Sequence, residues 1–108
     1  MISVKNKNDL AVQLNDAGDK LVVVDFYADW CSPCKMVTPK FVELSKKYPD
    51  VVMAKANLDE AEDLGQEYNI QTMPTFILFK RHEVVATYVG ADMDRLRKMI
   101  DQAKRTLP

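Results

Sequence analysis

Two cysteines stand three positions apart in the stretch DWCSPCK, and this pair is the feature of the sequence best suited to chemistry. Cys31 and Cys34 are the only cysteines of the chain, and they enclose Ser32 and Pro33. A close cysteine pair can hold a metal ion, close a structural disulfide, or cycle between dithiol and disulfide. Each of these uses requires something different from the rest of the chain.

A metal centre and a structural disulfide are both weakly supported. A structural metal site takes about four Cys or His ligands, whereas this chain offers its two cysteines and one histidine, His82, far along the sequence. A disulfide that closes so short a loop removes little entropy from the unfolded state, roughly 2 kcal/mol at best. Both uses stay open at this point, and we predict no metal site.

The residues after the pair predict a helix that begins at the cysteines. Apolar side chains recur there at helical spacing, namely Val37, Phe41, Leu44 and Tyr48. Unpaired backbone N–H groups and the helix dipole stabilise a thiolate at a helix N-terminus and lower its pKa. The spacing therefore favours a redox-active pair.

An acidic residue interrupts the apolar run LVVVDFYA that precedes the cysteines. The run is nearly all apolar and β-branched, which is typical of a central strand covered on both faces. A carboxyl group buried in such a strand has a raised pKa and can carry protons for a thiol, which makes Asp25 a candidate catalytic residue. The alternative is an acid at the strand end that faces solvent.

The remaining elements predict one α/β domain over residues 1–108, with a mixed central sheet of about five strands between about four helices. A first strand covers residues 2–4, and a helix follows with Asn8 as N-cap and Gly18 as its stop. The other expected elements are a strand at 51–57, a short helix at 60–68, a hairpin of 75–79 with 83–89, and a last helix with the stripe Leu96, Met99, Ile100, Ala103 and Leu107.

Composition limits the classes of partner. The 108 residues are 47% hydrophobic and 29% charged with a net charge of -1, and no basic run is long enough to track nucleic acid. No apolar stretch approaches the length of a membrane helix. The N-terminal sequence MISVKNKNDLAV has no secretory or transit character. We expect a cytoplasmic protein, with the nucleus as a further location.

The sequence resembles the thioredoxin family along essentially its whole length. The resemblance is carried by VVVDFYADWCSPCK, Pro39, AKANLDE, YNIQTMPTF and VGAD, in the order and spacing of that family. It implies the thioredoxin fold and a thiol–disulfide oxidoreductase that reduces disulfides in partner proteins and acts as a general electron donor in cell redox homeostasis.

The resemblance and the positions of the residues together assign roles. Cys31 is expected to be the exposed nucleophile and Cys34 the shielded, resolving cysteine. The family assigns proton transfer to the residue matching Asp25, with the lysine matching Lys55 beside it.

A docking surface for partner chains is also implied. Its residues in this sequence are Trp30, Met73, Pro74, Gly90 and Ala91. The resemblance implies a cis peptide bond before Pro74, whose backbone would hold the substrate chain. Core packing remains an alternative for Trp30 and Met73, and a backbone turn for Gly90.

Two positions depart from the usual family pattern. Ser32 replaces the glycine of the common Cys-Gly-Pro-Cys turn, and a hydroxyl that donates to the Cys31 thiolate would make the pair more oxidising. Pro33 stiffens the same loop and helps fix the sulfur geometry. Thr72 stands where some animal members carry another cysteine, so a dimer linked through that position is excluded and a monomer is expected.

The resemblance implies recycling and partners as well. No cofactor is expected on the protein, and electrons are expected from NADPH through thioredoxin reductase. Expected partners are disulfide-containing proteins such as peroxiredoxins, methionine sulfoxide reductase and ribonucleotide reductase. A different class of function, a binding module whose partner senses its shape or redox state, remains an alternative. A secretory oxidase or isomerase fits poorly without an export signal.

Overall fold

Five strands form a single mixed sheet in the structure, a computed structural model that describes residues 1–106. The strands are β1 Ile2–Ser3, β2 Val22–Tyr27, β3 Val52–Asn57, β4 Thr75–Lys80 and β5 Glu83–Val89. Their order in the sheet is β1-β3-β2-β4-β5. The first three in that order are parallel, and β4 and β5 are each antiparallel to the neighbour before them.

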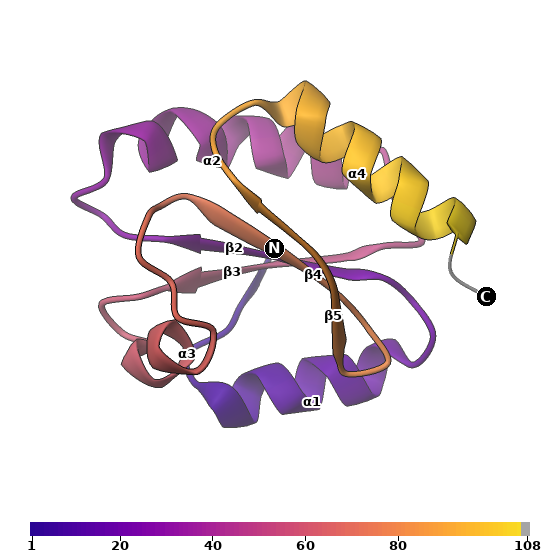
Figure 1. The fold of residues 1–108 in the computed structure, drawn as a ribbon, viewed down its shortest axis with the longest axis horizontal. Helices are drawn as coiled ribbons and strands as arrows, with labels where there is room; N and C mark the ends of the chain where they lie inside the picture. Colours follow the sequence, from indigo (N-terminus) through magenta and orange to yellow (C-terminus); the bar gives the residue numbers. More distant parts are fainter. Residues whose placement is uncertain (107–108) are drawn as a thin grey trace.

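Four helices cover this sheet among the described residues. They are α1 Lys7–Ala17, α2 Ser32–Ser45, α3 Glu62–Glu67 and α4 Met93–Thr106. Helices α1 and α3 lie on one side of the sheet, and α2 and α4 lie on the other (Figure 1). The predicted α/β fold is confirmed. The stripe of the last helix is buried at Leu96, Ile100 and Ala103, and Leu107 lies outside the described residues.

The central strand β2 places Asp25 on the side of the sheet that α2 covers. Successive side chains of a strand point to opposite faces. Val24 packs in the core beneath α1 and α3, and Val23 packs in the core beneath α2 and α4. Asp25 has the parity of Val23, so its carboxyl group lies on the same side as the helix that begins at the cysteines.

A two-residue turn closes the hairpin of β4 and β5, as predicted. Arg81 and His82 have φ of 50° and 70°, the left-handed conformation that two-residue hairpin turns require. His82 Nε2 lies 2.8 Å from Asn15 Oδ1, which ties the turn to α1. The histidine is therefore used in the turn, far from the cysteines.

The prediction of Asn8 as the N-cap of the first helix is wrong. Asn6 has the extended backbone of an N-cap, and its Oδ1 accepts a hydrogen bond from the Asp9 N–H at 2.8 Å. Asn8 lies within the first turn of α1. The end of this helix is as predicted, because Gly18 adopts φ of 59° and its N–H donates to the Asn15 carbonyl.

Candidate active site

Helix α2 begins at the cysteine pair. Cys31 is its N-cap, with extended backbone, and the Cys31 Sγ accepts a hydrogen bond from the Cys34 backbone N–H at 3.3 Å. Pro33 lies in the first turn, where a residue without an N–H is tolerated because that group would have no helical partner. The N-cap acceptor of α2 is therefore a sulfur atom, at a position where a side-chain oxygen is usual.

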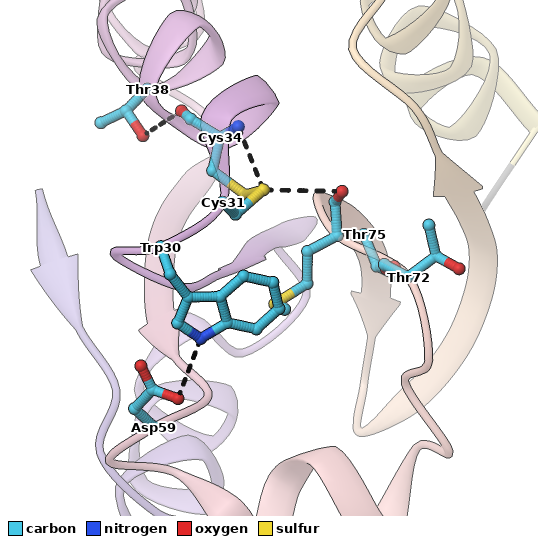
Figure 2. Close-up of a disulfide and its surroundings, with 8 residues drawn as sticks. Trp30, Cys31, Cys34, Thr38, Asp59, Thr72 and Thr75 are labelled. Carbon is cyan, nitrogen blue, oxygen red and sulfur yellow. Dashed lines mark hydrogen bonds between the residues drawn. A yellow bond between two sulfur atoms is a disulfide. The ribbon is translucent and has the colours of Figure 1, made fainter.

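The two cysteines form a disulfide with a Cα–Cα distance of 5.3 Å (Figure 2). Cys31 is 5% exposed and Cys34 is 1% exposed. Cys31 is therefore less accessible than the exposed nucleophile expected from sequence, because Met73 and Ala28 pack around the pair. It is still the more accessible of the two sulfur-bearing residues.

The segment directly before β4 lies against the disulfide. The Met73–Pro74 peptide bond is cis, as the family resemblance implies. The Met73 carbonyl oxygen lies 3.7 Å from Cys31 Sγ. The Pro74 carbonyl accepts a hydrogen bond from the Gly90 N–H at 3.2 Å. The structure thus brings together three segments that are far apart in the sequence.

Gly90 occupies a position where a side chain would be strained. Its φ is 151°, a backbone conformation that residues with a side chain rarely adopt. A Cβ at this position would lie 2.6 Å from Tyr88 Oη. Gly90 therefore serves the backbone, and the next residue, Ala91, is exposed.

Trp30 projects from the surface beside the disulfide. Its side chain is 69% exposed, so core packing does not explain it. The indole Nε1 donates to Asp59 Oδ1 at 3.4 Å (Figure 2). The Asp59 N–H donates to Asn57 Oδ1 at 3.0 Å. Asn57 Nδ2 also donates to Asp29 Oδ2 at 3.4 Å. These contacts hold the loop between β2 and α2, which carries Trp30, against the loop after β3.

Sequence reasoning did not single out Asp59 or Asn57. Both lie in the quoted stretch AKANLDE, but nothing in one sequence distinguishes them from other polar residues at a strand end. The one available signal is position, since β2 and β3 are parallel neighbours whose carboxyl ends share an edge of the sheet.

Asp25 is buried without a hydrogen-bond partner for one oxygen. The residue is 1% exposed, and its Oδ1 has no partner among the described residues. Burial raises the pKa of Asp25 to about 7, although the nearby Lys55 ammonium acts in the opposite direction. Lys55 is the residue of β3 directly opposite Asp25. The predicted pair is therefore adjacent in the sheet.

A depression with a volume of about 480 Å³ opens beside Cys34. Lys55 and Tyr27 line one side of it, and Thr38 and Pro39 of α2 line the other. Thr38 Oγ1 donates to the Cys34 carbonyl at 3.0 Å (Figure 2). Cys34 and Lys55, the neighbour of Asp25 in the sheet, therefore line the same depression.

Ser32 does not touch the sulfur atoms in this structure. It is exposed in the first turn of α2, and among the hydrogen bonds of residues 1–106 none joins its hydroxyl to Cys31 or Cys34. The hydrogen-bond donor to Cys31 Sγ is instead the Cys34 backbone N–H.

Two kinds of functional feature are absent from the part of the chain that the structure describes. No group of three or more His, Cys, Asp and Glu side chains within residues 1–106 is arranged to hold a metal ion. Within the same residues, none of the helices combines the length and the apolar character needed to cross a membrane.

A Cys-x-x-Cys disulfide at a helix N-terminus, facing a cis proline on a mixed sheet, is the arrangement of a thiol–disulfide oxidoreductase. The thioredoxin family model matches residues 1–102. The chain is 51% identical to Thioredoxin-T of Drosophila melanogaster over 100 residues, 92% of this chain and 64% of that protein. It is 44% identical to thioredoxin of Geodia cydonium, covering 94% of this chain and 96% of that protein. The solved Fasciola hepatica thioredoxin superposes with a TM-score of 0.92 at 35% identity, covering 94% and 98% of the two chains.

The chain belongs to the thioredoxin family. The predicted family, fold and enzymatic class are confirmed by these matches. It is a thiol–disulfide oxidoreductase with protein-disulfide reductase activity, and Cys31 and Cys34 form its Cys-x-x-Cys pair.

Proposed function

We propose that this protein is a general reductant of disulfides in partner proteins, with Cys31 as the attacking and Cys34 as the resolving residue. The observation that carries the proposal is the Cys34 N–H that donates to Cys31 Sγ at 3.3 Å. A backbone donor and the positive end of a helix dipole both favour the thiolate form of that sulfur, which is the form that attacks a disulfide.

The reaction transfers two electrons in two exchanges. The Cys31 thiolate attacks one sulfur of the partner disulfide, the S–S bond breaks, and the other partner sulfur leaves as a thiolate. Cys34 then loses its proton and attacks Cys31 Sγ. The mixed disulfide breaks, the second partner sulfur leaves as a thiolate, and the Cys31–Cys34 disulfide forms. The partner is reduced by two electrons, and its thiolates take up protons.

Asp25 is proposed to accept the proton of Cys34 in the second exchange. Its support is a carboxyl group buried on the α2 side of β2, with a pKa raised to about 7. A base with a pKa near the working pH is effective in proton transfer. Lys55 is proposed as the partner of Asp25. Its positive charge stabilises the ionised carboxylate and so opposes the effect of burial on the pKa of Asp25.

The docking surface is proposed to be formed by Trp30, Met73, Pro74, Gly90 and Ala91. Its support is the approach of the Met73 carbonyl to 3.7 Å from Cys31 Sγ and the exposure of Trp30. Backbone groups beside a cis proline can pair with an extended partner segment in the manner of an added strand.

Membership of the thioredoxin family supports a proposal for the supply of electrons and the range of partners. Electrons are proposed to come from NADPH through thioredoxin reductase, with no cofactor bound to this chain. The proposed substrates include peroxiredoxins, methionine sulfoxide reductase and ribonucleotide reductase, and the proposed location is the cytoplasm and nucleus. The protein is proposed to act as a monomer, without nucleic acid or membrane partners.

The experiment that tests this function is a redox titration combined with an insulin assay. The protein is equilibrated in glutathione or dithiothreitol buffers of set ratio, free thiols are trapped, and the Cys31–Cys34 potential is read. We expect a value near the roughly -270 mV typical of thioredoxin, with insulin reduction driven by NADPH and thioredoxin reductase. A value above about -200 mV, or failure to reduce insulin even with dithiothreitol, would contradict a general reductase.

A trapping experiment separates the enzyme from a pure binding module. Cys34→Ser leaves Cys31 able to attack but removes the resolving thiol, so we expect stable mixed disulfides with insulin chains on non-reducing gels. If Cys34→Ser protein performs its cellular task without forming such adducts, the binding module is the better account.

Ser32 is proposed to tune the potential, although its hydroxyl does not contact sulfur in the disulfide state. The proposal applies to the dithiol state, in which a thiolate is a stronger hydrogen-bond acceptor. We expect Ser32→Gly to lower the potential, since loss of a donor disfavours the reduced form. An unchanged or higher potential in Ser32→Gly would refute this role.

A further inference from the structure

Strand β5 has one covered face and one open face. Ala86 and Tyr88 pack into the core beneath α2 and α4. Val84, Thr87 and Val89 point the other way and are exposed, with Val84 at 47% and Val89 at 53%. On that side α1 and α3 bury the neighbouring β4 residue Ile77, but β5 is the edge of the sheet and stays uncovered. Two exposed valines on one face are therefore left without a partner.

A groove runs along this open face. Its volume is about 440 Å³, and it lies between β5 and the loop that follows α3. Ile77, Val84 and Val89 supply apolar surface, and Asn69, Thr72 and Thr87 supply amide and hydroxyl groups. None of its lining residues in the described chain is charged, although 29% of the sequence is charged. We call this feature the β5 groove.

The β5 groove is continuous with the surface around the disulfide. Thr72 lines the groove and directly precedes Met73, whose carbonyl oxygen lies 3.7 Å from Cys31 Sγ. At the same end Val89 directly precedes Gly90, whose N–H bonds to the Pro74 carbonyl. The other end is marked by Val84, which lies about 16 Å away at the rise of an extended strand. A chain leaving Cys31 past Pro74 therefore meets the groove.

We propose that the β5 groove is a second docking site for the protein substrate. Its occupant is an uncharged, extended segment of the partner that flanks the reacting cysteine and carries β-branched or small apolar side chains. This rests on the proposed function, because the segment is held in place by the mixed disulfide at Cys31. The groove would select partner segments by their side chains. Burial of apolar side chains in it is favourable, whereas a charged side chain would lose its water at a cost in free energy.

The features of the groove favour a polypeptide over other occupants. Its lining combines apolar side chains with amide and hydroxyl groups, which suits both the side chains and the backbone of an extended chain. A groove of about five strand residues in length matches a short segment, and contact with the redox surface places that segment next to the partner cysteine. Contacts of this kind add affinity to the exchange reaction without a further chemical group.

Val84→Asp tests the groove, with Val12→Asp as the matched control. Both valines are 47% exposed, and Val12 lies on α1 outside the groove. For each variant kcat/KM is measured for insulin and for the small disulfide dithiobis-nitrobenzoate. We expect Val84→Asp to lower the ratio of the two values about tenfold, through KM for insulin, because the new charge must be desolvated when the segment binds. Val12→Asp should keep the ratio of the parent protein.

Three results decide the case. An unchanged ratio in Val84→Asp, or an equal fall in Val12→Asp, would overturn the groove while leaving the proposed function intact. A parent protein that does not reduce insulin would overturn the proposed function and the groove together. If Val84→Asp lowers the unfolding temperature, the milder Val84→Thr, which keeps the β-branched shape, is compared with Val12→Thr by the same ratio.

Hydrogen exchange gives an independent readout. Cys34→Ser protein is trapped as a mixed disulfide with the reduced insulin B chain, and separately with glutathione, which occupies Cys31 but is too short to fill the groove. We expect slower exchange of amides in residues 84–89 and in the loop 69–72 in the B-chain adduct only. Equal exchange of these amides in the two adducts would overturn the proposal.

Discussion

Helices α1 and α2 begin in the same way but with different atoms. Asn6 Oδ1 accepts from the Asp9 N–H at 2.8 Å, and Cys31 Sγ accepts from the Cys34 N–H at 3.3 Å. In both cases an extended residue caps the third N–H of the helix. An amide oxygen is a good acceptor at all times, whereas sulfur is a weak acceptor until it becomes a thiolate. The cap of α2 is therefore strongest in the state that attacks a disulfide.

The charges of the two first turns differ as well. In α1 Asp9 adds a negative charge, and its Oδ2 accepts from the Lys5 N–H at 3.0 Å. The first turn of α2 contains no acidic residue. An acid there would repel a thiolate and raise the pKa of Cys31. In α1 the acidic residue of the first turn stabilises the helix. In α2 no acidic residue competes with the Cys31 sulfur for the positive end of the helix dipole.

Replacing the cap of α2 by that of α1 gives the largest expected effect. Cys31→Asn should lower insulin reduction by a factor of roughly 10³ or more, because the attacking sulfur is gone. The helix should still be capped, since asparagine is among the best N-cap residues. The measurements are insulin turbidity and urea unfolding, with Cys31→Ala as the uncapped control and the reduced parent protein as reference.

We expect Cys31→Ala to unfold more easily than Cys31→Asn, by about 1 kcal/mol. Equal stability of these two variants would mean that the Cys31 position does not contribute to helix stability as a cap. The comparison between the two helix starts would then fail at its first step.

Removing the buried acid beneath α2 gives the next effect, on stability. The pKa of Asp25 in the folded protein is about 7, above the unfolded value near 3.9. The folded state therefore binds a proton between these values, so the free energy of unfolding falls as pH rises through that window and levels off above it. Asp25→Asn lacks this fall. We expect it to be more stable than the parent at pH 8 by several kcal/mol, at most roughly 4, and close to it at pH 4.

Urea unfolding of the oxidised proteins across this pH range checks the prediction for Asp25. Asp16→Asn is the control, because Asp16 is an exposed acid on α1. A constant difference between Asp25→Asn and the parent at all pH values would contradict a proton uptake at this residue.

An acid placed in the first turn of α2 should give it the charge pattern of α1. Ser32→Asp puts a carboxylate in the same turn as the Cys31 sulfur, and we expect its negative charge to disfavour the thiolate. The rate of Cys31 alkylation by iodoacetamide at pH 6 should then fall about tenfold, because less thiolate is present. Ser32→Asn is the uncharged control of the same shape. A rate equal to that of Ser32→Asn would show that this charge does not reach the sulfur.

The fold could be predicted because its strongest patterns are local. The run of β2 is almost continuously apolar, and the apolar stripe of α4 follows the helical period. The turn at Arg81 and His82 has two residues, a length that allows few backbone conformations. The cysteine pair could be placed at a helix start for the same reason, since the stripe after it fixes where the helix lies.

What escaped prediction depends on contacts between distant segments. The bond from Trp30 to Asp59 joins two loops that only the parallel pairing of β2 and β3 brings together. In the disulfide state no hydrogen bond joins the Ser32 hydroxyl to sulfur among the described residues, and the donor to Cys31 Sγ is the Cys34 N–H. The open face of β5 could not be foreseen either, since strand periodicity does not tell which strand is the edge.

The start of α1 shows how small the local signal can be, and it provides the smallest effect. The stretch KNKND offers two asparagines, Asn6 and Asn8, and both are acceptable N-caps by residue type. The structure selects Asn6, whose side chain bonds to the Asp9 N–H. Asn6→Ala should lower the free energy of unfolding by about 1 kcal/mol, because that N–H loses its partner.

Asn8→Ala is the control for Asn6→Ala, and it should be neutral or slightly stabilising, since alanine is a better helix former within the first turn. Urea unfolding measures both variants, and insulin reduction should be unaffected because α1 lies on the side of the sheet away from α2 (Figure 1). If Asn8→Ala proved the more destabilising change, the helix would begin two residues later in solution. The cap of α1 would then no longer match that of α2, and the sulfur cap would have to be understood without its oxygen counterpart.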